Sequence, residues 1–411
     1  MELKKPKKIV MITSGQPSLN PRLVKEADAL AGAGYDVTVL YAYWNDWGTI
    51  FDKKLIPTKK WKAICAGGDP HQKKLTYFFS RLIHGFAKWI SRQSNGKYLA
   101  ELAISRASYF LSREAKKHEA DIYLGHNLGA LPATVKAAKT NKKPCGFDAE
   151  DMHRYEISDN KADYDVILKS ALEDRYFPEV DYLTASSPLI AREYQQLFPD
   201  KNPVVVLNVF PRDNNIKQPI KNDGTTIKLF WFSQTIGSHR GVEDVLAALK
   251  LLNDNSFELH LLGYLTEEIS SLIIEYKNSV NVCVHQPVAP DDMIKFASQF
   301  DIGLATENAV PLNRDICLTN KIFTCMQAGL AIVASDTIAQ SELFYKYSSI
   351  GKTYKNGDIN ALAEALLYYQ QNRDKLFETR KAAFDIANEQ LNWEAESKRF
   401  LDLVDQTLNN H

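Results

Sequence analysis

The sequence predicts an α/β protein made of two doubly wound parallel sheets. Short apolar runs rich in β-branched residues alternate with helical patterns from the start of the chain. This alternation begins again after a polar stretch at residues 214–226. The length of 411 residues also exceeds what one hydrophobic core usually organises. We therefore expect two domains joined by a linker near residues 210–225.

The first predicted strand and helix have clear start and stop signals. Residues 8–13 form an apolar run that predicts a buried strand. Asn20 and Pro21 predict an N-cap followed by proline at the first helical position, and Gly32 and Gly34 predict the helix end. Further strands are expected at residues 35–41, 121–125, 146–148, 182–185 and 204–209, and in the second half at 227–232, 258–262, 280–284, 302–305 and 331–335.

Composition and charge argue against several classes of protein. Fifty basic and fifty acidic side chains give no sign of nucleic-acid binding. Five scattered cysteines without CxxC spacing argue against a disulfide framework, and no residue set has the spacing of metal ligands. No apolar run is long enough for a signal peptide or a membrane span. We expect a cytoplasmic protein, free or peripheral at the inner face of a membrane, with no metal.

One stretch departs from the balanced charge. Residues 53–117 hold 15 basic and three acidic side chains, interleaved with aromatic and aliphatic residues. This pattern predicts contact with an anionic membrane surface. The alternative is a solvated helical surface on which lysine stems lie along apolar neighbours.

Ligand-binding residues are expected after the strands, because ligands of open α/β sheets bind outside the carboxyl ends of the strands. Gly15 follows the first strand, where a glycine lets backbone N–H groups approach an anion, or alternatively only makes a tight turn. His126 follows residues 121–125 and suits proton transfer or a hydrogen bond to a sugar, unless it is structural. Asp148, Asp151 and His153 follow the next strand, and with His126 they are the predicted catalytic residues.

The second half contains a candidate phosphate site. Ser233, Thr235 and Arg240 lie between the strand at 227–232 and a helix expected to begin near Val242. Hydroxyls, an arginine and a helix N-terminus together predict a phosphate cradle; the alternative is a solvated loop.

A second basic residue of this half lies at a predicted helix start. Thr319 or Asn320 can cap the helix expected at 322–328, and Lys321 places a positive charge in a first turn that already favours an anion. We therefore expect a bound anion there. His285 and Val288 follow the strand at 280–284 and are expected to border a nucleobase.

Taken together, the two halves resemble the GT-B glycosyltransferases, specifically their large retaining family four. The resemblance rests on the strand–glycine loop–helix at the start of the chain, on residues 230–249 (FWFSQTIGSHRGVEDVLAAL) and on residues 319–336 (TNKIFTCMQAGLAIVASD). It implies two Rossmann-like domains facing across a cleft. Residues 1–212 would form the acceptor domain and 213–389 the donor domain, with a helix at 390–411 packing back on the first.

The resemblance implies transfer of a sugar from a UDP- or GDP-linked donor to a glycan or lipid-linked acceptor in the assembly of cell-envelope polysaccharide, with retention and with no metal or cofactor. By position, Gly15 would approach the diphosphate or the acceptor, and His126 the reacting sugar. Arg240 and Lys321 would hold the phosphates and stabilise the leaving diphosphate.

Two positions depart from the family pattern. Ile316 and Thr324 stand where the family often has glutamates. Thr324 is expected to replace its glutamate in donor binding only weakly, and Glu307 is the candidate that compensates from another place. Two alternatives remain open. One is a sugar-nucleotide 2-epimerase with the same architecture. The other is a catalytically silent partner subunit that binds a nucleotide sugar.

Overall fold

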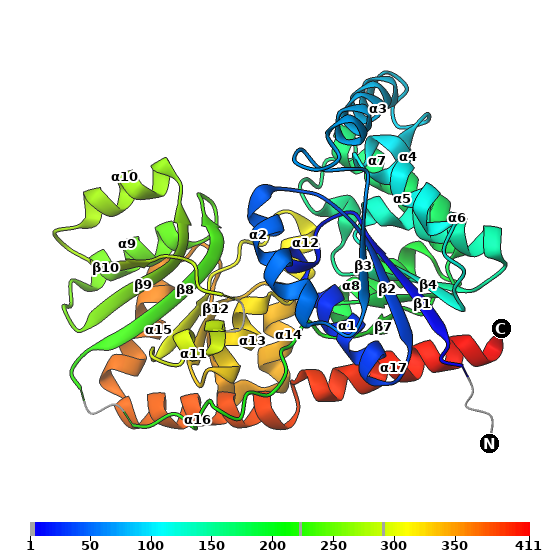
Figure 1. Cartoon of the computed structure of the whole chain (residues 1–411). Helices are drawn as coiled ribbons and strands as arrows, with labels where there is room; N and C mark the ends of the chain where they lie inside the picture. Colours follow the sequence, from blue (N-terminus) through cyan, green and yellow to red (C-terminus); the bar gives the residue numbers. More distant parts are fainter. Residues whose placement is uncertain (1–4, 222–223, 290–291) are drawn as a thin grey trace. The chain divides into compact units, whose positions relative to one another are not determined.

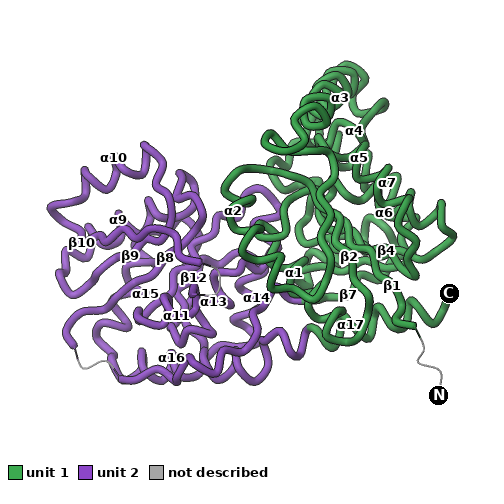
Figure 2. Tube along the Cα trace, viewed as in Figure 1, with its two compact units in different colours: residues 1–206, 397–411 green, residues 207–396 purple. Residues whose placement is uncertain are grey.

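The computed structural model describes residues 5–221, 224–289 and 292–411. The chain divides into two compact units, one made of residues 1–206 with 397–411 and the other of residues 207–396 (Figure 2). The first four residues, and residues 222–223 of the expected linker, lie outside the described part of the chain.

Unit 1 is built on a parallel sheet with the strand order β3-β2-β1-β4-β5-β6-β7 in the described residues (Figure 1). β1, β4 and β5 are buried along nearly their whole lengths, as a parallel sheet covered on both faces requires. The strands are β1 (Lys8–Thr13), β2 (Asp36–Ala42), β3 (Lys62–Ala66), β4 (Ile122–His126), β5 (Cys145–Ala149), β6 (Tyr182–Ala185) and β7 (Val204–Val205).

Helices connect these strands. The predicted cap of the first helix is confirmed: the Asn20 side chain accepts a hydrogen bond from the backbone N–H of Leu23 at 3.0 Å, and Pro21 begins the helix. The helices are α1 (Pro21–Gly32), α2 (Asp46–Leu55), α3 (Lys74–Gln93), α4 (Ala100–Ala103), α5 (Ser108–Ala115), α6 (Leu131–Asn141), α7 (Tyr164–Tyr176) and α8 (Pro188–Leu197).

Unit 2 is also built on a parallel sheet, with the strand order β10-β9-β8-β11-β12-β13 within the described residues. Trp231, Leu259 and Val333 belong to its buried core. The strands are β8 (Ile227–Ile236), β9 (Phe257–Leu265), β10 (Asn281–His285), β11 (Ile302–Ala305), β12 (Ala331–Ser335) and β13 (Gly351–Tyr354). The helices are α9 (Val242–Leu252), α10 (Glu267–Tyr276), α11 (Met293–Ala297), α12 (Leu312–Ile316), α13 (Asn320–Gln327), α14 (Ile338–Lys346), α15 (Ile359–Gln371) and α16 (Arg373–Glu389).

The last helix, α17 (Trp393–Asn410), begins in unit 2 and continues into unit 1. In unit 2 the backbone N–H of Trp393 donates to the carbonyl of Phe210. In unit 1 a guanidinium nitrogen of Arg399 donates to the carbonyl of Val205 at 3.0 Å. α17 is therefore anchored in both units through backbone groups. Throughout the described residues, no helix combines the length and the apolar character needed to cross a bilayer.

The predicted fold class of two doubly wound parallel sheets is confirmed. β3 and β13 were not predicted, because β3 lies in the basic stretch and β13 is a four-residue strand that begins with glycine. β7 ends at Val205, four residues before the end of the predicted run.

We expect the replacement Asn20→Ala to lower the free energy of unfolding by about 1 kcal/mol, because it removes the acceptor for a helix N-terminal N–H. Urea unfolding followed by circular dichroism measures this change. Lys54→Ala, at an exposed position of α2, is the control and should change the midpoint little. An unchanged midpoint in Asn20→Ala would show that the cap does not stabilise α1.

Candidate functional site

The strand orders place one topological switch point in each unit, between β1 and β4 in unit 1 and between β8 and β11 in unit 2. Ligands of doubly wound sheets bind outside the carboxyl ends of the strands at such points. The loops after these four strands are therefore the candidate site. They include the predicted residues Gly15, Arg240 and Glu307, whereas His126 is the last residue of β4 itself.

At the switch point of unit 1, the loop after β1 and the loop after β4 are in close contact. The Thr13 hydroxyl donates to the side-chain oxygen of Asn127 at 2.6 Å and accepts from the backbone N–H of Gly15 at 3.3 Å. A Cβ on Gly129 would lie 2.7 Å from the Ser14 hydroxyl. The close approach of the two loops explains the glycine at position 129, whereas a Cβ on Gly15 would meet nothing closer than 4.0 Å.

The predicted residue Asp148 lies in a buried charge cluster. Its carboxylate accepts two hydrogen bonds from Arg22, at 2.6 and 2.8 Å, and one from the Thr184 hydroxyl at 2.7 Å. The third nitrogen of the Arg22 guanidinium donates to the carbonyl of Val206 at 2.6 Å. Burial opposes ionisation of Asp148, but the charges of Arg22 and His126 hold its pKa well below the usual range.

His126 belongs to the same cluster. Its ring nitrogens lie 3.1 Å from Glu26 and 3.4 Å from Asp148, and only 1% of the residue is exposed. Burial lowers the pKa of His126, but the two carboxylates outweigh that effect and raise the pKa to about 10. These contacts explain His126 and Asp148 as buried structural charges, and the catalytic role expected for them stays a prediction.

The two other predicted catalytic residues lie close by. His153 is buried; burial opposes its protonation, but Glu156 and Glu173 raise its pKa above the usual value. Its backbone N–H donates to the Tyr194 hydroxyl at 2.9 Å, and that hydroxyl donates to the backbone carbonyl of Asp151 at 3.1 Å. Hydrogen bonds therefore hold the backbone of this loop in place.

Sequence reasoning did not select two titratable groups beside this cluster. Burial and the Arg22 charge lower the pKa of Lys25 to about 7. Burial and the neighbouring carboxylates of Asp151 and Asp148 raise the pKa of Glu150 to about 7. Groups that titrate near neutrality are frequent at functional sites. The density of acidic residues after β5 was the signal in the sequence.

A pocket of about 420 Å³ opens beside the carboxyl ends of β1 and β2. The Arg106 guanidinium donates to the carbonyls of Gly67 and Tyr43 and to the Ser80 hydroxyl, and it lies 4.6 Å from the centre of the Tyr77 ring. Such a wall of aromatic rings and hydrogen-bonding groups suits a sugar or a phosphate. The lining residues are Ser14, Ala42, Tyr43, Trp44, Tyr77, Arg81, His84, Gly85, Ser105, Arg106 and Ala107.

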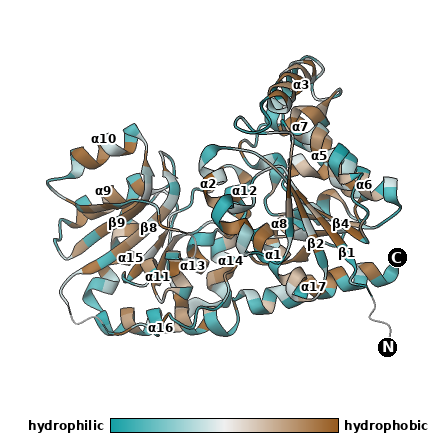
Figure 3. Cartoon of the chain, in the orientation of Figure 1, coloured by the Kyte–Doolittle hydropathy of each residue, from teal (hydrophilic) through white to brown (hydrophobic). Residues whose placement is uncertain are grey.

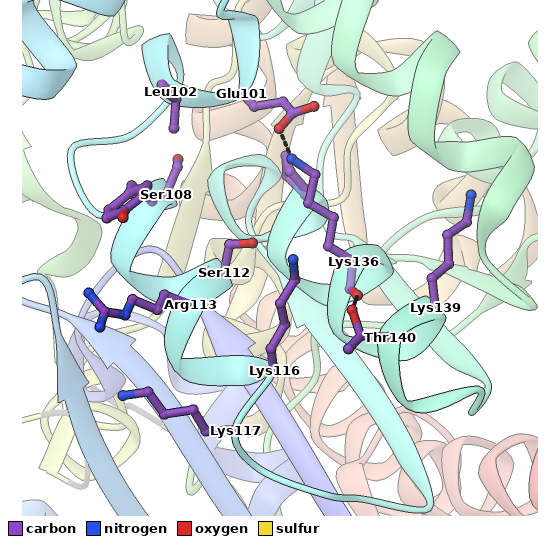
Figure 4. A pocket seen from close by; sticks show the side chains of 12 residues that line it. Glu101, Leu102, Ser108, Ser112, Arg113, Lys116, Lys117, Lys136, Lys139 and Thr140 are labelled. Atoms are coloured by element: carbon purple, nitrogen blue, oxygen red, sulfur yellow. Dashed lines mark hydrogen bonds and ion pairs between the residues drawn. The ribbon is translucent and has the colours of Figure 1, made fainter.

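A larger cavity, of about 750 Å³, lies against helices α4, α5 and α6 (Figure 4). Its lining is rich in basic side chains, but Lys136 pairs with Glu101, Lys139 with Glu179, and Lys117 with Glu114. This cavity is not lined by the loop that follows β1, nor by residues 127–130, which follow β4. The smaller pocket is therefore the one associated with the switch point.

In unit 2 the loop after β8 turns sharply at Gly241. This glycine has φ +81°, and a Cβ there would lie 2.2 Å from the carbonyl oxygen of Thr306. The carbonyl of His239 accepts hydrogen bonds from Asn308 at 2.8 Å and from Arg314 at 3.1 Å. Arg240 and Gly241 therefore lie in close contact with the loop that follows β11.

Three predicted residues come together at this loop. The Lys321 ammonium lies 2.5 Å from the Glu307 carboxylate, and the Thr319 hydroxyl donates to the same oxygen at 3.3 Å. Lys321 also lies 5.1 Å from the centre of the Trp231 ring. Burial opposes ionisation of Glu307, but Lys321 and Arg240 lower its pKa below the usual value. Lys321 is thus already paired with an anion that belongs to the protein.

Glu307 itself is held by its backbone. Its carbonyl accepts hydrogen bonds from the Ser335 hydroxyl and the Asn356 amide, both at 2.6 Å. Ser335 is the last residue of β12 and Asn356 follows β13. Both therefore obey the rule of strand carboxyl ends that selected the other residues. Asn356 was missed because β13 was not predicted.

The remaining predicted donor residues are arranged around this pair. The exposed Arg240 donates to the Ser233 hydroxyl at 2.9 Å, and Thr235 is exposed on β8. Asn320 is the first residue of α13. The expectation that Thr319 or Asn320 caps α13 is wrong in one respect: Thr319 occupies the N-cap position, but its hydroxyl donates to Glu307 instead.

The residues at the two glutamate positions of the family do not join this group. Ile316 is buried at the end of α12, and Thr324 is buried in α13 with a hydroxyl that has no hydrogen-bond partner in the described structure. Within the described residues, no group of three His, Cys, Asp or Glu side chains is placed to hold a metal ion.

The expected base-binding residues lie at and after the carboxyl end of β10, an edge strand of the described sheet. The His285 ring nitrogen lies 2.9 Å from that of His260, and the two rings are stacked. Burial lowers the pKa of both histidines and so favours their neutral forms. Val288 is half-buried in the loop that follows. Contact of His285 and Val288 with a nucleobase stays a prediction.

Two parallel-sheet units with covering helices are the fold of the GT-B class, and comparisons with known proteins agree. Residues 240–402, which cover most of unit 2 and the first part of α17, match the family model described as Glycosyl transferase-like. A comparison with curated proteins found no match. The expected resemblance to GT-B glycosyltransferases is confirmed at this level.

Solved structures support the fold over the whole chain. A sucrose-phosphate synthase from Thermosynechococcus elongatus has a TM-score of 0.69 at 13% identity, with 98% of this chain and 100% of that chain covered. Anabaena HepE in complex with UDP and glucose has a TM-score of 0.69 at 14% identity, covering 97% and 100%. A TarM mutant of S. aureus in complex with fondaparinux, alpha-GlcNAc-glycerol and UDP has a TM-score of 0.68 at 12% identity, covering 97% and 99%.

The replacement His126→Gln should destabilise the protein in a pH-dependent way. The folded-state pKa of about 10 lies above the ordinary value of 6.5, so the charged ring contributes stability that is fully present below pH 6.5 and lost as the pH rises to 10. The difference in Tm between wild type and variant should be largest at pH 6 and shrink toward pH 10. A difference that grows with pH would contradict a charged His126 in the folded protein.

Proposed function

We propose that the chain transfers a sugar from a nucleotide-sugar donor, UDP- or GDP-linked, to a glycan or lipid-linked acceptor in the assembly of cell-envelope polysaccharide. The observation that carries the donor half is the cluster of Arg240, Lys321 and Glu307 at the switch point of unit 2. The positive charges of Arg240 and Lys321 exceed the single negative charge of Glu307. The site therefore carries a net positive charge, which suits a diphosphate. The UDP in the HepE and TarM complexes makes UDP the first nucleotide to test.

Unit 1 supplies the acceptor half of the proposal. The 420 Å³ pocket beside β1 and β2 offers rings for the faces of a sugar and the Arg81 guanidinium for a phosphate. We also propose that the chain works in the cytoplasm and contacts an anionic membrane through part of residues 53–117, where basic and apolar residues alternate.

The proposed reaction retains the anomeric configuration and uses no metal. A bond forms between the acceptor oxygen and the anomeric carbon, and the bond between that carbon and the phosphate oxygen breaks. The acceptor proton passes to the departing phosphate, because His126 and Asp148, at 1% and 4% exposure, are engaged with Arg22 and Glu26. Arg240 and Lys321 stabilise the charge on the leaving diphosphate.

Thermal-shift measurements with UDP, GDP and ADP test the donor site. A nucleotide at 100 times its Kd should stabilise the folded state by about 2.7 kcal/mol. We expect the shift with one nucleotide to be lost in Arg240→Ala and in Lys321→Ala, and to persist in the control Lys277→Ala, at an exposed position of unit 2. No shift with any nucleotide would overturn the donor assignment.

Product analysis tests the reaction itself. Incubation with the donor that binds and a mixture of glycan and lipid-linked acceptors should give a product whose anomeric NMR coupling matches that of the donor. An inverted anomer would overturn retention. An epimerised donor in the absence of acceptor would identify a 2-epimerase. Binding without turnover would favour the catalytically silent subunit. The buried Ile316 and Thr324, which stand at the glutamate positions of the family, are the observation that favours this second candidate.

A further inference from the structure

Helix α3 exposes a continuous apolar stripe. Leu75, Phe78, Phe79, Leu82, Phe86 and Trp89 are each more than half exposed. Their spacing of three, four and seven residues places them on one face, which extends about 21 Å along the axis at 1.5 Å per residue. α3 stands at the edge of unit 1, and Figure 3 shows hydrophobic colouring on it. Protein surfaces rarely leave so large an apolar patch in water without a function.

The opposite face of α3 belongs to the protein interior and to the pocket. Ser80, Ala87 and Ser91 are buried, and the helix packs against α4. Tyr77 and His84 line the 420 Å³ pocket from this face. The same helix therefore forms a wall of the proposed acceptor pocket and presents its apolar stripe to the surroundings.

Basic residues occupy one flank of the helix. Lys74, Arg81 and Lys88 recur every seven residues and Arg92 follows four later, which places all four about 90° from the apolar stripe at 100° per residue. Residues 70–100 contain six basic and no acidic side chains. An apolar face with cations on its flank is typical of a helix that lies in a lipid–water interface.

The charge also selects among possible occupants of the stripe. A second copy of this chain bound face to face would bring the basic flanks of two α3 helices into one interface with no acidic residue of the segment to compensate. An anionic bilayer supplies both an apolar layer and negative headgroups. Trp89 and Phe86, exposed at the end of the stripe, are the kinds of side chain that favour this interface.

We propose that α3 docks unit 1 on an anionic lipid bilayer, with the apolar stripe below the headgroups and the basic flank among them. The wall formed by Tyr77, Arg81 and His84 then lies next to the headgroup layer, so the acceptor of this pocket is membrane-anchored. The docking surface assigns the membrane contact proposed above to α3 and does not depend on the proposed donor site, whereas this identification of the acceptor rests on the proposed function.

Co-sedimentation of the full chain with vesicles tests the docking surface. The protein should bind vesicles of phosphatidylcholine with 25% phosphatidylglycerol, and the double variant Phe86→Glu/Trp89→Glu should bind at least about tenfold more weakly. Lys88→Glu/Arg92→Glu should lose the preference for the anionic lipid and the sensitivity to salt. None of these four residues lines the pocket. The matched control in unit 2 is Ile274→Glu/Lys277→Glu, which replaces an exposed apolar and an exposed basic residue and should bind like wild type.

Two outcomes would overturn the proposal. In one, wild type and Phe86→Glu/Trp89→Glu bind the vesicles equally. In the other, sedimentation velocity shows that the wild type is a dimer which the same variant converts to a monomer, with no vesicle binding by either. Circular dichroism and the nucleotide thermal shift confirm that the variant is folded. Vesicle binding without any nucleotide shift would leave the docking surface intact and remove the proposed donor site. A nucleotide shift without vesicle binding would remove the docking surface and leave the donor site intact.

Discussion

The bidentate pair of Arg22 and Asp148 is the interaction on which the interior of unit 1 depends. Arg22 is fully buried in α1, and its guanidinium joins that helix to β5 through Asp148 and to the segment after β7 through the carbonyl of Val206. Thr184 adds β6 to the same carboxylate. Removing one partner of such a pair leaves an uncompensated charge in the core, at a cost of about 3–5 kcal/mol. The pair therefore specifies how α1 sits across the carboxyl half of the sheet.

Unit 2 is organised around a carboxylate at the corresponding end of its sheet. Glu307 follows β11, its carbonyl is held by groups from the ends of β12 and β13, and its side chain receives Lys321 and Thr319 from the start of α13. Each of these groups lies at a strand end or a helix start, where backbone and side-chain dipoles converge. The positive site is consequently built on rigid elements, apart from Arg240, which is exposed and held through Ser233.

The fold could be predicted from the sequence because buried parallel strands appear as apolar runs and because caps such as Asn20–Pro21 act locally. The candidate site was predicted less well. A rule about strand ends selects His126, and a rule about helix starts selects Lys321. The sequence does not reveal that Glu26 and Asp148 enclose the first or that Glu307 pairs with the second. Those contacts join residues that lie 14 to 100 positions apart, so only the packing of the elements brings them together. Asn356 was missed for a different reason: the short strand β13 that precedes it begins with glycine and was not predicted.

For the proposed transfer reaction, the pairing of Lys321 with Glu307 has a consequence for turnover. An arriving phosphate does not have to order a free lysine, whose side chain would lose up to about 2 kcal/mol of rotamer entropy, because Glu307 already holds the ammonium in place. The same carboxylate competes with the phosphate for that ammonium at every moment of the cycle. The internal competitor thus limits how tightly the spent nucleotide is retained, and it recaptures the lysine when that nucleotide departs. If the proposed function holds, this arrangement predicts weak product inhibition.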